Sequence, residues 1–132
     1  MPSTAFATKR LSSAPDAITP DGSEVRVLCG LDRGGMALFS LPPKAVSKAI
    51  AHRTVEEVWF VVWGCGRMWR RLGDAEETVD LAPGVSISLP TGTHFQFRCD
   101  GFEPLTAIGV TMPPWPGADE AYAVAGIWEP TV

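Results

Sequence analysis

Short apolar runs recur along the chain from Glu24 onward, and turn residues separate them. A spacing of roughly ten residues between such runs is typical of an all-β sandwich or barrel. The pattern therefore predicts β-strands throughout residues 24–112. The runs, with their turn residues, are "EVRVLCGLDRGG", "MALFSLPP", "VEEVWFVVWGCG", "RMWRRLGD", "TVDLAPG", "VSISLPTG", "THFQFRCDG" and "PLTAIGVTMPP".

The run "EVWFVVW", residues 57–63, is the most apolar of these segments. Because side chains alternate along a strand, its odd-numbered positions share one face and its even-numbered positions share the other. Both faces are apolar, so both need cover. We expect one face to fill the barrel and the other to meet a second sheet or a second subunit, which makes a homodimer the expected state.

Two segments fall outside this strand pattern. Residues 42–58, "PPKAVSKAIAHRTVEEV", fit either a short amphipathic helix or an extended connection, and the flanking strands favour the extended form. The segment 112–117 contains three prolines, which a central strand does not accept. We therefore expect an N-terminal arm or loop over residues 1–23, a barrel over 24–112 and a C-terminal strap over 113–132. Trp115 and Trp128 would pin this strap to the body or to a neighbouring subunit.

Composition narrows the class of protein. A chain of 132 residues with 45% hydrophobic and 20% charged residues fits one soluble domain, and no apolar run is long enough to cross a membrane. The net charge of −4 and the lack of basic clusters argue against nucleic-acid binding and leave a small molecule as the expected partner. The start of the chain lacks the apolar segment of a secretory signal, and three scattered cysteines suit no disulfide framework. A cytoplasmic protein with reduced thiols is expected.

Two segments carry a family resemblance. "HRTVEEVWFVVWGCG" resembles the first motif of the cupin superfamily, in which a glutamate is followed by six residues and a glycine, as Glu57 is by Gly64. "GVSISLPTGTHFQFR" resembles the second motif, with Gly84, Pro90 and Gly92 at the expected spacing. The chain is thus similar to small single-domain cupins over residues 30–112. The resemblance implies a double-stranded β-helix, or jelly-roll barrel, that is commonly dimeric and has a pocket for a small molecule.

In cupins the two motifs together supply three histidines and a glutamate to a divalent metal. The corresponding set in this chain is His52, Glu57 and His94, which would suit Fe, Mn, Ni, Cu or Zn. The first motif has lost one histidine, because either Ile50 or Thr54 stands in its place.

The second motif also departs from the pattern. Phe95 stands where the histidine is expected, and His94 comes one residue early. Strand alternation turns His94 away from the pocket unless a bulge follows Gly92. A metal-free barrel is therefore the alternative to a metal site.

The remaining candidates surround these residues. Glu57 could be neutralised by Arg53, Arg67 or Arg71 instead of a metal, since a buried carboxylate needs a partner. Aromatic side chains are expected to form the pocket wall or the core, namely Trp59, Trp69, Phe95 and Phe97.

Three functions remain open from the sequence. The first is a metal-dependent enzyme of the isomerase, dioxygenase or decarboxylase type. The second is a metal-free enzyme in which His52 or Glu57 acts as a general base whose pKa is shifted by the apolar pocket. The third is a binding module that holds a small ligand without turnover. The resemblance supports all three, because one fold hosts many functions.

Overall fold

The computed structural model describes residues 5–132, which form eleven β-strands in two sheets and contain no helix. The expected arm begins with residues 1–4, which lie outside the described part. No helix in residues 5–132 is long and apolar enough to cross a membrane. The strands are β1 (Ala17–Ile18), β2 (Glu24–Leu31), β3 (Gly34–Leu41), β4 (Ile50–His52), β5 (Glu56–Trp63), β6 (Gly66–Leu72), β7 (Ala75–Leu81), β8 (Ser86–Leu89), β9 (His94–Cys99), β10 (Leu105–Met112) and β11 (Ala121–Ala123).

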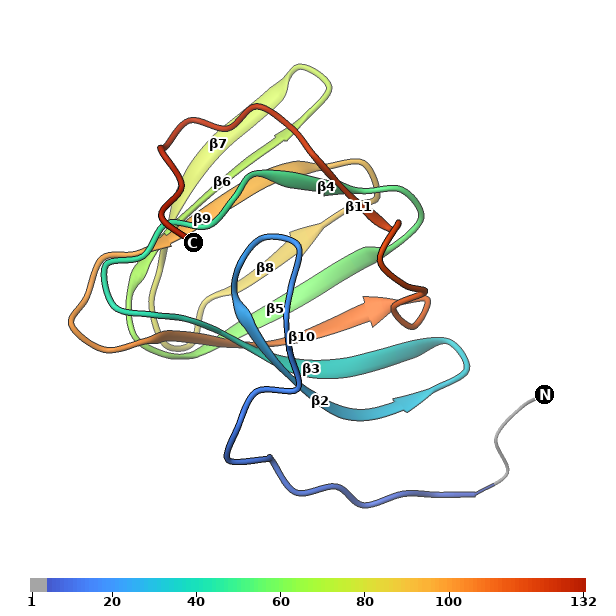
Figure 1. Ribbon diagram of the computed structural model, residues 1–132. Coiled ribbons are helices and arrows are strands. Elements are labelled where there is room, and N and C mark those ends of the chain that lie inside the picture. The colour runs from blue at the N-terminus through green and yellow to red at the C-terminus, as the bar shows by residue number, and fades with distance from the viewer. Residues whose placement is uncertain (1–4) are drawn as a thin grey trace.

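The strands pair antiparallel in the orders β1-β2-β3-β10-β5-β8 and β11-β4-β9-β6-β7. Figure 1 shows the two sheets as separate layers, with the C-terminal segment in red passing over the smaller one. Residues 42–58 are extended, as expected: Val46 bridges to Arg98, and β4 pairs with β9. The prediction of an all-β, double-stranded β-helix barrel is confirmed.

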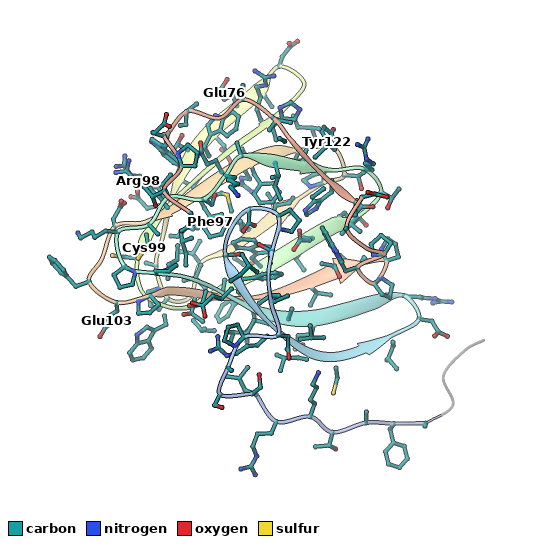
Figure 2. The ribbon with its side chains drawn as sticks, viewed as in Figure 1. Glu76, Phe97, Arg98, Cys99, Glu103 and Tyr122 are labelled. Atoms are coloured by element: carbon teal, nitrogen blue, oxygen red, sulfur yellow. The ribbon has the colours of Figure 1, made fainter. Side chains whose placement is uncertain are left out.

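The core lies between the two sheets and is built from the inward positions of facing strands. Met68 lies opposite Phe97 in the register of β6 and β9, and both are buried. The Phe97 ring packs edge to face on Trp59 of the other sheet, with centroids 5.0 Å apart. Figure 2 labels Phe97 on the strand that also carries Arg98 and Cys99. Aromatic contacts of this kind add to the burial of large apolar area. The core thereby fixes β5 against β9, the two strands that carry the candidate motifs.

Strand β5 alternates as predicted over most of its length. Glu57, Trp59 and Val61 point inward and are buried, whereas Val58 and Phe60 are 42% and 48% exposed. The expectation that Trp63 shares the inward face is wrong. A register shift against β10, between Thr106 and Ala107, breaks the alternation, and Trp63 is 56% exposed. Cover of the outer face by a second subunit stays a prediction.

Residues from the two segments that flank the predicted barrel also join it. Residues 17–23, assigned above to the arm, form β1 and a loop in which the buried carboxylate of Asp21 accepts the N–H of Ser23 at 2.8 Å. Near the C-terminus, the buried Gln96 side chain accepts the N–H groups of Ile127 and Trp128, both at 3.0 Å. Its amide nitrogen donates to the carbonyls of Ser47 and Trp128, both at 2.8 Å. One side chain therefore fixes the end of the strap on the outer face of β9.

Candidate functional site

A cavity of about 680 Å³ lies between the sheets at one end of the barrel. Strands β2 and β3 form one wall, His52 and Glu57 project from β4 and β5, and residues of the loop 19–21 and the strap complete the lining. Cavities of this size are typical of small-molecule sites. The lining residues are Ala17, Ile18, Thr19, Pro20, Asp21, Val25, Val27, Leu28, Gly35, Met36, Ala37, Phe39, Ile50, His52, Glu57, Trp59, Thr111, Pro114, Trp115 and Ala118.

His52 and Glu57 form a hydrogen-bonded pair in this cavity. The Nδ1 atom of His52 lies 3.1 Å from Oε2 of Glu57, and the side chains are only 5% and 4% exposed. The indole N–H of Trp59 donates to the other oxygen, Oε1, at 3.1 Å. Because β4 and β5 belong to different sheets, the pair bridges the barrel. The short turn 53–55 between these strands brings the two side chains together.

Burial shifts the proton affinities of both residues toward their neutral forms. Desolvation raises the pKa of Glu57 from 4.5 to about 7. The negative charge of Asp21 also raises this pKa, whereas the hydrogen bond from Trp59 lowers it. Desolvation also lowers the pKa of His52, which the negative charges of Glu120 and Asp21 oppose. Both shifts favour the uncharged pair at acidic pH, in which the protonated Glu57 carboxyl donates to Nδ1 of a neutral His52.

Aromatic rings fix the orientation of His52. Its imidazole packs edge to face against Phe95 on one side, at 5.4 Å between centroids, and against Trp115 on another, at 5.1 Å. Within residues 5–132 no hydrogen bond occupies Nε2, the second ring nitrogen. With Glu57 ionised, the carboxylate accepts Nδ1–H and the lone pair of Nε2 is available to a ligand. The pair can then act as a general base.

Thr111 is a site residue that the sequence did not indicate. It lies directly opposite Glu57 in the register of β10 and β5, is 7% exposed and lines the cavity. Within the described chain its hydroxyl makes no hydrogen bond. The only available signal was its position in the run "PLTAIGVTMPP", where a threonine is unremarkable because β-branched residues are common in strands.

Glu120 is a second residue that the sequence did not indicate. Its buried carboxylate accepts the backbone N–H of Thr54 at 2.8 Å, the N–H of Val55 at 3.0 Å and the hydroxyl of Thr54. Burial acts to raise its pKa, but these hydrogen bonds and the proximity of His52 outweigh that effect and hold the pKa below its ordinary value. The strap thus supports the turn between the strands of the pair. A contact across 66 residues leaves no local signal in the sequence.

The structure does not bring His94 to His52 and Glu57. Phe95 is buried in the core and lies opposite Ile50, so alternation places His94 on the outer face of β9. No group of three or more His, Cys, Asp or Glu side chains in residues 5–132 is placed to hold a metal ion. The predicted set of three ligands is therefore not assembled, because no bulge follows Gly92 to turn His94 inward.

The donor chemistry at this position does not fit a transition metal. Apolar Ile50 and Phe95 occupy the two positions at which further imidazoles would be needed, and the facing atoms of His52 and Glu57 hydrogen-bond each other. Transition metals in proteins require several nitrogen, oxygen or sulfur ligands. His52 and Glu57 alone therefore supply fewer ligands than a transition-metal site requires.

Other predicted site residues divide between the cavity and the rest of the barrel. Trp59 lines the cavity, and Phe95 and Phe97 pack behind it. The expectation that Trp69 lines the pocket is wrong. It lies opposite Gln96 on the outer face of its sheet and donates its indole N–H to Glu76 at 2.9 Å. Its strand places Met68 inward, so alternation turns Trp69 outward.

None of the three arginines proposed as partners pairs with Glu57, and Arg71 is exposed to solvent on β6. Arg53 donates to the carbonyl of Asp119 at 2.9 Å and lies over the ring of Tyr122, whereas Arg67 pairs with Asp100. Glu57 is instead contacted by the two neutral donors of the cavity, the imidazole of His52 and the indole of Trp59. A cation therefore does not hold this carboxylate in its ionised form.

Comparison with known proteins identifies the family of the chain. The family model for the cupin domain matches residues 37–111, more than half of the chain, so the chain belongs to the cupin family. A search of curated proteins found no match.

Solved structures with the same fold include several distant relatives. BH2720 from Bacillus halodurans has a TM-score of 0.64 and 21% identity over 70% of this chain and 72% of its own. Oxalate decarboxylase from Bacillus subtilis, which carries Mn(II) centres, has a TM-score of 0.69 and 17% identity over 85% of this chain. The capsular polysaccharide assembling protein CapF from Staphylococcus aureus has a TM-score of 0.64 and 18% identity. This chain covers only 30% and 33% of the last two, so the likeness concerns the fold alone.

Proposed function

We propose that this cupin is a metal-free proton-transfer enzyme in which His52 and Glu57 act together on a small molecule in the barrel cavity. One observation carries the proposal: the 3.1 Å contact between His52 Nδ1 and Glu57 Oε2 in a largely apolar cavity. With Glu57 ionised and Nδ1–H donated to it, Nε2 takes a proton from the bound molecule. The adjacent carboxylate stabilises the resulting imidazolium.

The electrostatics support this assignment. A general base is most effective when its pKa lies near the working pH, and burial raises the pKa of Glu57 to about 7. The deprotonated pair is the basic form, so the rate of proton abstraction should rise with pH and level off above about 7. Isomerisation and cyclisation are the reaction types that such a base serves.

Solvent-deuterium exchange tests the proposal. A panel of small ketones, both neutral and anionic, is incubated with the protein in D₂O, and loss of the protons next to the carbonyl is followed by NMR. We expect exchange in the wild type, and a loss of about 100-fold or more in His52→Asn and Glu57→Gln. Folding of the variants is checked by tryptophan fluorescence.

Metal dependence is measured on the same samples. Elemental analysis of protein purified without a histidine tag precedes assays with chelator and after loading with Fe, Mn, Ni, Cu or Zn. We expect equal exchange rates in the untreated, chelator-treated and metal-loaded samples. Exchange that appears only after metal loading would overturn the proposal in favour of a metal-dependent cupin. Ligand binding without exchange at any pH would instead assign a binding module.

A further inference from the structure

The cavity contains two carboxyl side chains but no lysine or arginine. Among its lining residues only Asp21, His52 and Glu57 are titratable, and neither lysine nor arginine contributes. Two arginines adjoin lining residues along the chain and are engaged elsewhere: Arg26 donates to the carbonyls of Ser12 and Ser13, and Arg53 is directed to Asp119 and Tyr122 on the strap. A negatively charged ligand would therefore find no opposite charge in the cavity.

Asp21 contributes to this excess of acidic over basic groups, and its carboxylate is buried and held in place. It accepts the hydroxyl of Thr19 at 2.5 Å and the backbone N–H of Ser23 at 2.8 Å, and it is 4% exposed. Burying an unpaired anion is costly, and a second negative charge in the same cavity adds repulsion. Carboxylate and phosphate ligands are thus disfavoured.

The walls favour a flat, apolar molecule. The ring of Phe39 stacks on Trp59 with an interplanar angle of 14° and centroids 5.5 Å apart, and a third aromatic ring of the lining, Trp115, packs against His52. Aliphatic side chains, among them Val25 and Val27, form much of the remaining surface. Such walls gain most from burying apolar ligand surface.

One uncommitted donor stands beside the proton-transfer pair. Thr111 lies opposite Glu57 on the neighbouring strand, and such paired positions place their Cβ atoms about 4.5–5.5 Å apart. Its hydroxyl has no partner within residues 5–132. A ligand oxygen that accepts from Thr111 would hold an adjacent carbon within reach of the pair.

We propose that the cavity takes an uncharged carbonyl compound with an apolar ring, and that the Thr111 hydroxyl donates to its carbonyl oxygen. This inference rests on the proposed function for the chemical step. In that step Nε2 of His52 forms a bond to a proton on the carbon next to the carbonyl. The C–H bond breaks, and its electron pair moves to the oxygen, which Thr111 stabilises as an enolate. Return of a proton to carbon completes the cycle without any co-reactant.

Two matched probes test the substrate class, namely 4-phenylbutan-2-one and the anion 2-oxo-4-phenylbutanoate. Both carry the same phenyl ring and the same methylene next to the ketone, so they differ in charge at one end. Binding is measured by saturation-transfer NMR and deuterium exchange by one-dimensional spectra of the same samples. We expect the neutral probe to bind at least about tenfold more tightly than the anion.

Substitutions test whether the cavity lining causes the preference for the neutral probe. Thr111→Val should lower the affinity for the neutral probe by about tenfold. Thr111→Ser keeps the hydroxyl and should leave that affinity unchanged. Val27→Lys adds a cation to the lining at a position that is 47% exposed and should raise affinity for the anion. Leu31→Lys, on the same strand and 68% exposed but outside the lining, is the matched control and should leave both affinities unchanged.

The outcomes separate this inference from the proposed function. Equal or tighter binding of the anion by the wild type would overturn the inference, yet exchange of that anion would leave the proton-transfer function standing. Binding of the neutral probe without exchange would support the substrate class and overturn the function. Binding of neither probe at millimolar concentration, or an unchanged affinity in Thr111→Val, would overturn the inference.

Discussion

Glu57→Gln should change how the stability of the protein depends on pH. In the wild type, burial raises the pKa of this carboxyl from 4.5 to about 7, so folding favours its protonated form. The associated stability is fully present below pH 4.5 and is lost as the pH rises through about 7. Glutamine is uncharged at every pH and can still hydrogen-bond His52 and Trp59, so the variant lacks this loss.

The size of the effect follows from linkage. At 1.36 kcal/mol per pH unit, the wild type should lose about 2.5 kcal/mol relative to Glu57→Gln between about pH 5 and about pH 8. His52 contributes with the opposite sign, because its lowered pKa makes stability fall as the pH drops below 6.5. That contribution is present in both proteins and largely cancels in their difference.

Urea unfolding followed by tryptophan fluorescence measures this difference across the pH range. The control is Glu56→Gln, since Glu56 is the adjacent glutamate but is exposed on the outer face of β5. Its stability difference from the wild type should stay nearly constant. A constant difference for Glu57→Gln as well would refute the claim that Glu57 is buried in protonated form.

Further predictions concern the barrel and its surfaces. Gln96→Leu should lower the unfolding free energy measured in urea by about 2–4 kcal/mol, because the N–H groups of Ile127 and Trp128 lose their hydrogen-bond acceptor. A loss below about 1 kcal/mol would mean that Gln96 does not fix the end of the strap. Gly66→Ala should abolish soluble expression, since an added Cβ would lie 1.8 Å from the carbonyl oxygen of Arg98; a normal melting temperature would contradict this close approach. Light scattering should show a dimer that Phe60→Glu dissociates, and a monomeric wild type would remove the expected role of the exposed apolar face.

The barrel was predictable because its signals are local. Period-two runs and the turn glycines define most strands, and Gly64, Gly84 and Gly92 all adopt the positive φ that only such residues take readily. Strict strand alternation turned His94 outward, but a bulge after Gly92 would have turned it inward as a ligand, and only the structure shows that Phe95 is the buried residue. Trp63 escaped prediction because a register shift depends on the partner strand, β10.

The site was only partly predictable because it is assembled over long distances in the chain. His52 and Glu57 are five residues apart and fall within one motif, so their pairing was accessible. Thr111, Trp115 and Glu120 arrive from the far end of the chain, through strand register and strap docking. The sequence predicted that Trp115 would pin the strap, but its contact with His52 has no periodic or compositional signal, and neither have the contacts of Thr111 and Glu120.

The docking of the strap has an evolutionary consequence. Gln96 fixes residues 127–128 from one side, and Glu120 fixes the strap to the turn 53–55 from the other. Pro114, Trp115 and Ala118 of the strap line the cavity. The hydrogen bonds of Glu120 and Gln96 that anchor the strap do not involve these three residues. Substitutions and length changes there can accumulate without disturbing the barrel. The part of the cavity wall that the strap supplies can thus change more freely than the barrel that carries it, except that loss of Trp115 would also remove its contact with His52.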